Sequence, residues 1–145
     1  MECQFPTINS DDNQIKELFK NIKNIAIVGL SPDDSKDSNK VAQYLKGQGY
    51  KIIPIYPKEE YILGEKVYRS LSEVDEKIDL VDVFRKPDSV CEIVDEILKR
   101  DDIKALWLQI GVVNNEQAQR AKDSGLMVVQ SRCTMIEHKK LFGLV

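Results

Sequence analysis

The sequence predicts a single α/β domain in which a five-stranded parallel sheet is covered by helices on both faces. Short apolar runs alternate along the chain with longer segments that have helical periodicity, and this alternation is typical of a doubly wound sheet with crossover helices. The length of 145 residues suffices for one core but not comfortably for two. We assign residues 24–145 to this domain and residues 1–23 to an N-terminal arm and a helix that packs on it.

The predicted strands are short and apolar, as expected for strands buried on both faces of a sheet. The second strand contains Pro54, which cannot donate a ladder hydrogen bond and therefore argues against a central position. In chain order, the predicted strands span residues 25–28, 51–56, 79–84, 105–109 and 127–130.

The first two helices are indicated by capping residues and by helical spacing. Residues 10–12 can cap a first helix, which follows a loose arm over residues 1–9. Ser38 or Asn39 can cap a second helix that ends near Gly47. The apolar residues at helical spacing are Ile15, Leu18, Phe19 and Ile22 in the first helix and Val41, Ala42 and Leu45 in the second.

Two further helices follow the third and fourth strands. Pro87 suits the first position of one of them, and Cys91 lies beside its apolar stripe and is predicted to belong to the core. Asn114 can cap the other, which stops at Gly125. Residues 61–74 are predicted to form a loop that ends in a short helical turn. The stripe of the helix after Pro87 consists of Val90, Ile93, Val94, Ile97 and Leu98.

Composition and charge exclude several classes of function. The net charge of −3 argues against a nucleic-acid partner, and no apolar run approaches the length of a membrane helix. The N-terminus lacks the charged and apolar regions of a signal peptide. The cysteines are odd in number and lack metal-ligand spacing, which favours a reducing, cytoplasmic setting without a metal site. They are Cys3, Cys91 and Cys133.

The connection after the first strand has the form of a phosphate-binding loop. Gly29 ends the strand, a polar loop follows, and a helix then begins. A helix N-terminus offers free N–H groups and a partial positive charge to an anion, and glycine permits close approach. Lys36 adds a mobile charge. The dinucleotide fingerprint G-x-G-x-x-G is absent, so an ordinary strand-to-helix connection is the alternative.

Two other basic residues follow predicted strands. Lys58 comes after the second strand, where NAD-binding folds place an acidic residue, so NADP or coenzyme A is favoured over NAD. Arg85 follows the third strand and suits a second phosphate contact; a surface ion pair is the alternative. Carboxyl ends of parallel strands meet at one edge, and Gly29, Pro57, Arg85, Gln109 and Ser131 are all predicted to lie there.

Several motifs resemble the stand-alone CoA-binding domain family. In chain order they are IAIVGLSP, IIPIYPK with ILGEKVYRSL, DLVDVFRKP, ALWLQIGVVN and RCTMIEHKKLFG. The last two are the most specific, and the match spans residues 24–142. The family consists of small Rossmann-type proteins similar to the CoA-binding domain of succinyl-CoA synthetase. The resemblance therefore implies a Rossmann-like fold and coenzyme A, or an acyl-CoA, as the ligand.

The resemblance also implies a set of ligand contacts. The first loop and helix would meet the CoA phosphates, the end of the second strand would flank the adenosine, and the third and fourth strand ends would meet the diphosphate and pantetheine. One departure is Ser131, where the family often has aspartate. The implied residues are Gly29, Ser31, Pro32, Lys36, Ser38, Val41, Pro57, Lys58, Phe84, Arg85, Pro87, Gln109, Gly111 and Val112.

No convincing catalytic constellation is visible. A nucleophile–base pair could be formed by Cys133 and His138, with Glu137 between them. However, the five residues from Cys133 to His138 do not place the thiol and the imidazole squarely on one face of a helix. Asp79 and Asp82 are predicted to frame the third strand rather than to act in chemistry. Succinyl-CoA synthetase carries its phosphorylated histidine on an additional domain, and this chain ends at Val145 before such a domain, which implies a binding module.

Three functions follow from these expectations. The first is a cytoplasmic, non-catalytic carrier or sensor of CoA or acyl-CoA. The second is an NADP-binding oxidoreductase-type domain, for which no residues of a hydride-accepting substrate pocket are evident. The third is a regulatory module whose protein partner, or second copy in a homodimer, reads the ligand state.

Overall fold

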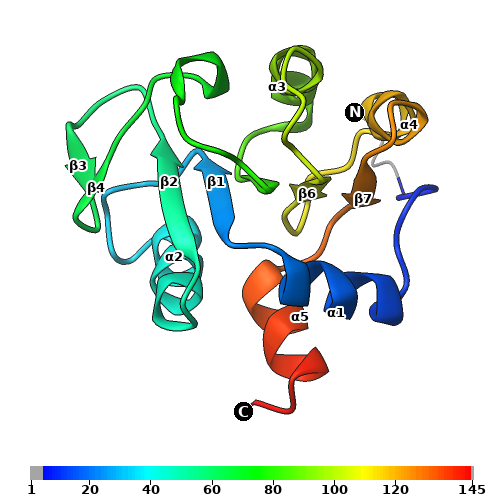
Figure 1. Cartoon of the computed structure of the whole chain (residues 1–145), viewed down its shortest axis with the longest axis horizontal. Coiled ribbons are helices and arrows are strands. Elements are labelled where there is room, and N and C mark those ends of the chain that lie inside the picture. Colours follow the sequence, from blue (N-terminus) through cyan, green and yellow to red (C-terminus); the bar gives the residue numbers. More distant parts are fainter. Residues whose placement is uncertain (1–4, 145) are drawn as a thin grey trace.

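The computed structural model describes residues 5–144 and contains the predicted five-stranded parallel sheet (Figure 1). The strand order is β2-β1-β5-β6-β7, so the chain reverses direction across the sheet after β2. The carboxyl ends of β1 and β5 flank this switch point, where such sheets bind ligands. The strands are β1 (Asn24–Val28), β2 (Lys51–Ile55), β5 (Leu80–Val83), β6 (Ala105–Leu108) and β7 (Met127–Val129).

Helices cover both faces of the sheet, as Figure 1 shows. Helices α1 (Asp12–Asn21), α2 (Asp37–Gly47) and α5 (Thr134–Leu141) pack on one face around Phe19 and Trp107. The opposite face carries α3 (Val90–Leu98), α4 (Asn115–Asp123) and the 3₁₀ turn η1 (Leu71–Glu73). Each face has its own apolar core, which confirms the predicted doubly wound domain.

Pro54 is accommodated because β2 is an edge strand. Its carbonyl accepts a hydrogen bond from the Tyr68 amide at 3.0 Å, and Tyr56 donates to the Tyr68 carbonyl at 3.0 Å. The segment before Tyr68 forms a small hairpin of β3 (Tyr61–Ile62) and β4 (Glu65–Lys66). This hairpin lies where the sequence predicts a plain loop.

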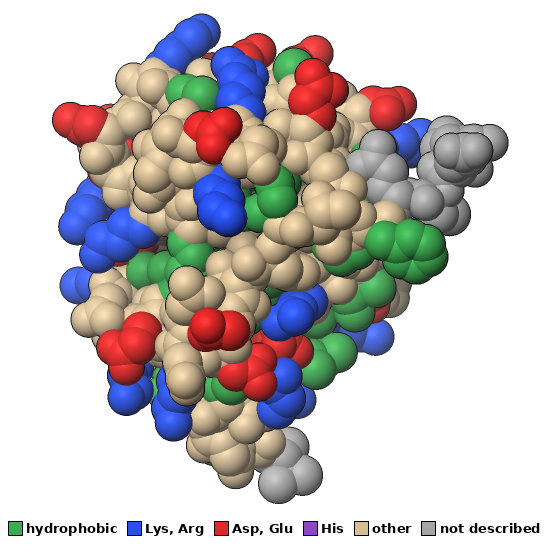
Figure 2. Space-filling model, turned by 90° about the vertical axis from the view of Figure 1, so that its right-hand side faces the viewer, with side chains coloured by type: hydrophobic (Ala, Val, Ile, Leu, Met, Phe, Trp, Pro, Cys, Tyr) green, Lys and Arg blue, Asp and Glu red, His purple; other side chains and the backbone are tan. Residues whose placement is uncertain are grey.

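The surface is mixed in charge. Figure 2 shows Lys and Arg side chains interspersed with Asp and Glu on the face at the right of Figure 1. Among the helices described, none is both long and apolar enough to cross a bilayer.

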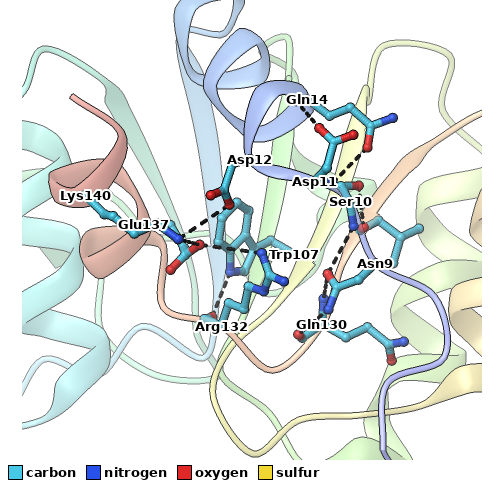
Figure 3. Close-up of polar contacts among 11 residues, drawn as sticks. Asn9, Ser10, Asp11, Asp12, Gln14, Trp107, Gln130, Arg132, Glu137 and Lys140 are labelled. Atoms are coloured by element: carbon cyan, nitrogen blue, oxygen red, sulfur yellow. Dashed lines mark hydrogen bonds and ion pairs between the residues drawn. The ribbon is translucent and has the colours of Figure 1, made fainter. Parts of the chain in front are cut away.

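The segment before α1 is tied to strand β7 rather than loose, as Figure 3 shows for Asn9 and Ser10. Ser10 Oγ donates to the Val128 carbonyl at 2.8 Å, and Asn9 exchanges two hydrogen bonds with the Gln130 backbone. These contacts cover the edge of the sheet at β7, which would otherwise be exposed. The prediction of a loose arm is therefore wrong for residues 5–9, while residues 1–4 lie outside the described range.

Helix α1 begins as predicted and is fastened to α5. Asp11 caps it and forms a reciprocal capping box with Gln14. Lys140 on α5 forms ion pairs with Asp12 at 3.4 Å and with Glu137 at 3.2 Å (Figure 3). Helix α1 is thus an extra element that packs on the sheet through α5 and the core around Phe19.

The remaining boundaries follow the predicted order with small shifts. Pro87 opens a 3₁₀ turn, η2 (Pro87–Ser89), that leads into α3, and Asn114 caps α4 through the Gln117 amide. Cys91 is exposed on α3, so its predicted place in the core is wrong. Helix α5 was not predicted, because its buried residues include the polar Thr134 and Glu137, which leaves no apolar stripe.

Candidate functional site

The carboxyl ends of the five strands bring the predicted residues to one edge of the sheet. Gly29 ends β1 with a φ of +88°, and a Cβ on it would lie 2.7 Å from the Phe84 carbonyl oxygen and 3.5 Å from Arg85 Cδ. The loops that follow β1 and β5 are therefore in direct contact, as predicted. Only glycine fits at this position, because the Phe84 backbone approaches Gly29 too closely for a side chain.

The loop after Gly29 is closed onto the first turn of α2. Ser38 Oγ accepts a hydrogen bond from the Ser31 amide at 3.0 Å, and Asn39 Nδ2 donates to the Ser31 carbonyl at 2.8 Å. The helix begins at Asp37 and its N-cap is Lys36, which makes no side-chain cap. The prediction that Ser38 or Asn39 is the cap is wrong by two or three residues, because both side chains bond back to the loop.

The edge contains a broad open hollow of about 400 Å³, which we call the central pocket. It lies between the segments that follow β5 and β6. Phe84 is half-buried, while Arg85 is exposed and forms no ion pair within the described residues. The lining residues are Phe84, Arg85, Lys86, Pro87, Gln109, Ile110, Gly111 and Val112.

A second hollow of about 240 Å³ adjoins the central pocket through Arg85, and we call it the Arg69 pocket. It lies between the ends of β1 and β2, the turn η1 and helix α3. Arg69 Nη1 donates to the carbonyls of Tyr56, Lys58 and Glu59 at 2.8–3.1 Å, which fixes the loop after β2. Two arginines, Arg69 and Arg85, therefore line a pocket that is also lined by Glu92 and Glu96.

A third hollow of about 240 Å³ adjoins the central pocket on its other side, and we call it the α5 pocket. It shares Phe84, Gln109 and Ile110 with the central pocket. The remaining walls come from the first turn of α2 and the start of α5; these residues are Asp37, Lys40, Val41, Cys133, Met135 and Ile136.

A buried polar network lies beneath the two pockets that contain Gln109. Gln109 Nε2 donates to Asp82 Oδ1 at 2.7 Å and to Thr134 Oγ1 at 3.0 Å, and the Thr134 hydroxyl donates to Asp82 Oδ2 at 3.0 Å. Burial raises the pKa of Asp82 to about 7, although both hydrogen bonds oppose the shift. Asp82 therefore lies inside β5 and positions Gln109, a role beyond framing the strand.

Cys133, Glu137 and His138 have separate environments. The Cys133 thiol is buried at the α5 pocket, and burial raises its pKa. His138 is buried in an aromatic cluster with Phe19 and Phe142, and its Nδ1 lies 2.7 Å from the Tyr44 hydroxyl. Glu137 lies within ion-pair distance of Arg132 and Lys140.

Ser131, the departure from the family pattern, has a defined contact. It adopts a φ of 56°, which is uncommon for a residue with a side chain. Its Oγ accepts a hydrogen bond from the Gly111 amide at 3.1 Å and so ties the end of β7 to the central pocket. Serine therefore supplies an acceptor oxygen to the Gly111 amide.

The structure gathers half of the predicted contact residues into these pockets. Those that line the central pocket or the α5 pocket are Val41, Phe84, Arg85, Pro87, Gln109, Gly111 and Val112. Those that lie on the loops around the edge, outside the three pockets, are Gly29, Ser31, Pro32, Lys36, Ser38, Pro57 and Lys58.

The lining residues that were not predicted include Arg69, Lys40, Met135 and Ile136. Arg69 follows an unpredicted hairpin, and Met135 and Ile136 lie on the unpredicted helix α5. Arg69, Met135 and Ile136 stand within motifs that carry the family resemblance, and Lys40 lies at the start of a predicted helix. Within residues 5–144, no cluster of three or more His, Cys, Asp or Glu side chains could hold a metal ion.

The model of a family described as the CoA binding domain matches residues 23–139. The chain belongs to the CoA-binding domain family. It is 36% identical over 130 residues to the uncharacterized protein YneT of Bacillus subtilis, covering 90% of this chain and 96% of YneT. A solved structure of a hypothetical protein from Pyrococcus horikoshii is 38% identical with a TM-score of 0.89, covering 99% of this chain and all of that one.

Longer enzymes contain a related region. An ADP-forming acetate–CoA ligase of Methanocaldococcus jannaschii is 27% identical over 118 residues, which is 77% of this chain but only 17% of the ligase. This CoA-binding domain therefore corresponds to a small part of that enzyme.

Proposed function

We propose that the protein binds coenzyme A, or an acyl-CoA, along the carboxyl edge of its sheet and acts as a non-catalytic carrier, sensor or regulatory module. The observation that carries the proposal is the row of three adjoining pockets. It runs from Arg69 and Arg85, across the central pocket, to the apolar α5 pocket. Coenzyme A has the same order of parts, with phosphates towards one end and a flexible pantetheine arm at the other.

The basic side chains support placement of the phosphates near Gly29 and Arg85. Arg85 passes over Gly29 and forms no ion pair within residues 5–144, so its charge is available to a ligand. The N-terminus of α2 lacks a side-chain cap and adds favourable electrostatics for an anion. The match to the CoA binding domain family supports coenzyme A as the ligand.

The environments of the reactive side chains support binding without turnover. Both N–H groups of the Gln109 amide are engaged by Asp82 and Thr134, so neither is free to polarise a thioester. Burial raises the pKa of the Cys133 thiol, which opposes formation of the nucleophilic thiolate.

Thermal unfolding with CoA, dephospho-CoA, NADP and NAD in parallel tests the ligand. At a hundred times its dissociation constant, CoA is expected to stabilise the fold by about 2.7 kcal/mol, a shift of about 5–11 °C for a domain of this size. The shift is expected to shrink with dephospho-CoA, which lacks the 3′-phosphate. A shift with NADP alone would instead support the oxidoreductase-type domain, and no shift with any ligand would refute nucleotide binding.

Replacement of Arg85 by alanine tests the phosphate contact. Loss of one charge-assisted hydrogen bond, worth about 1.5 kcal/mol or more, is expected to weaken CoA binding about tenfold in a calorimetric titration. The fold is expected to stay intact because Arg85 is exposed. Lys99→Ala removes an equally exposed charge at the far end of α3 and is expected to leave affinity unchanged. Equal affinities for wild type and Arg85→Ala would remove Arg85 from the site.

A further inference from the structure

We propose that the α5 pocket receives the acyl group of a CoA thioester, so that the preferred ligand is an acyl-CoA with a short, uncharged, apolar acyl chain. This inference rests on the proposed function, because it requires the pantetheine arm to lie in the central pocket. The two pockets adjoin one another, since Phe84, Gln109 and Ile110 line both. In the proposed complex, the end of the pantetheine arm passes from the central pocket towards the α5 pocket.

The walls of the α5 pocket are suited to an apolar group. Asp37 and Lys40, on the first turns of α2, are the charged residues that line it, and they carry opposite signs. The two charges offset one another, so the pocket offers no net positive charge to hold a negatively charged acyl group such as a succinyl group. The apolar lining residues are Val41, Phe84, Ile110, Cys133, Met135 and Ile136.

Two large aliphatic side chains at this pocket remain in water. Ile110 is 64% exposed and Ile136 is 51% exposed, and both line the pocket. They come from the segment after β6 and from helix α5. An acyl chain in the pocket would cover part of this apolar surface, and its removal from water favours binding. Free CoA, which ends in a thiol, leaves more of this surface exposed.

The size of the pocket limits the chain. Its volume of about 240 Å³ is below the range of about 300–1,000 Å³ that is typical of pockets for drug-sized ligands. A short acyl chain fits this space together with the end of the pantetheine arm. A long fatty chain does not, and would extend into solvent.

Calorimetric titration of the intact protein with CoA, acetyl-CoA, butyryl-CoA and succinyl-CoA tests the inference. Each methylene group removed from water is expected to tighten binding about fourfold, so butyryl-CoA is expected to bind about tenfold or more tightly than acetyl-CoA. Succinyl-CoA is expected to bind no more tightly than free CoA.

A matched pair of variants locates the acyl group. In Ile136→Asp, the ratio of the CoA and butyryl-CoA dissociation constants is expected to fall towards one, because a carboxylate replaces the aliphatic wall. Phe5→Asp introduces the same charge at a side chain that is 83% exposed and outside the pocket, and the ratio is expected to remain at the wild-type value. Both sites are exposed, so both variants are expected to fold.

The outcomes separate the two proposals. Equal affinities for CoA and butyryl-CoA would overturn the acyl pocket while leaving CoA binding in place. A preference for butyryl-CoA that survives in Ile136→Asp would place the acyl chain elsewhere and would also overturn it. Failure of every one of these ligands to bind would refute the proposed function, and the acyl inference with it.

Discussion

Replacement of Gly29 by alanine is expected to lower the free energy of unfolding by about 4 kcal/mol, from backbone strain and steric overlap together. The backbone at Gly29 has a φ of +88°, where a side chain is strained. The new Cβ would also lie 2.7 Å from the Phe84 carbonyl oxygen. That carbonyl belongs to the backbone just after β5, so relief requires the ends of β1 and β5 to separate.

Gly49→Ala is the matched control for this prediction. Gly49 has a similar φ of +96°, but a Cβ there meets no atom within 4 Å. Replacement of Gly49 by alanine is expected to lower the free energy of unfolding only by the backbone strain, about 1–2 kcal/mol. Urea denaturation of the two variants measures both losses. Similar losses would show that the contact between Gly29 and Phe84 adds nothing to the strain.

Urea denaturation of the Gly29→Ala variant, together with a CoA titration, distinguishes two reasons for a glycine at this position. From the sequence, Gly29 suits the close approach of a ligand, whereas the structure shows close approach of the Phe84 backbone. A variant of normal stability that fails to bind CoA would favour the first reason. A strongly destabilised variant is expected from the second.

The five strands and their succession along the chain were predictable because each buried strand is a compact apolar run, and because glycine, proline or capping residues mark the turns and helices between them. Pro54 argued against a central position for its strand, and the edge position of β2 agrees with that objection. The convergence of Gly29 and Arg85 followed from parallel strand ends and needed no side-chain detail.

The residues that were missed depend on tertiary contacts. Helix α5 buries Thr134 and His138, which find polar partners in Asp82 and Tyr44 rather than apolar ones. A periodicity argument cannot detect such a helix, because the partners come from distant strands and helices. The Arg69 pocket was missed for the same reason, since the guanidinium of Arg69 bonds to backbone carbonyls ten or more residues earlier.

The burial of Asp82 could not be predicted from the sequence. An aspartate in a strand can face solvent or core, and only the packing of α5 against β5 and β6 completes its surroundings. In the structure, Asp82 is fully buried, with Gln109 and Thr134 as its hydrogen-bond partners. Burial raises the pKa of Asp82 from its ordinary value of 3.8 to about 7. The stability of the protein is therefore expected to depend on pH through this group.

Asp82→Asn is expected to remove a loss of stability that the wild type suffers at alkaline pH. Between pH 4 and 7, folded Asp82 binds a proton that the unfolded chain lacks, so the wild type loses stability as the pH rises. The loss attributable to Asp82 reaches about 4 kcal/mol above pH 7 as an upper bound. Asparagine carries no charge, so the variant is expected to be more stable than the wild type at pH 8.5.

At pH 5 the two proteins are expected to differ little, because protonated aspartate and asparagine have similar shape and hydrogen-bonding capacity. Chemical denaturation of both proteins at several pH values measures the difference. Burial lowers the pKa of His138, so protonation of His138 destabilises both proteins at low pH, and subtraction of the two profiles removes this common effect. Parallel profiles would show that Asp82 is ionised in the fold at both pH values.

Asp79→Asn is a control whose effect on stability at alkaline pH is expected to be opposite to that of Asp82→Asn. Burial favours the protonated form of Asp79, but hydrogen bonds from the Asn24 and Lys23 amides outweigh it and lower its pKa. Its contribution is therefore present above pH 4 and is lost as the pH falls through its folded pKa. Asp79→Asn is expected to lose stability at pH 8.5, where Asp82→Asn gains it. The two carboxylates differ because one oxygen of Asp79 accepts hydrogen bonds from two backbone amides that favour the charge, whereas Asp82 is enclosed where burial opposes it.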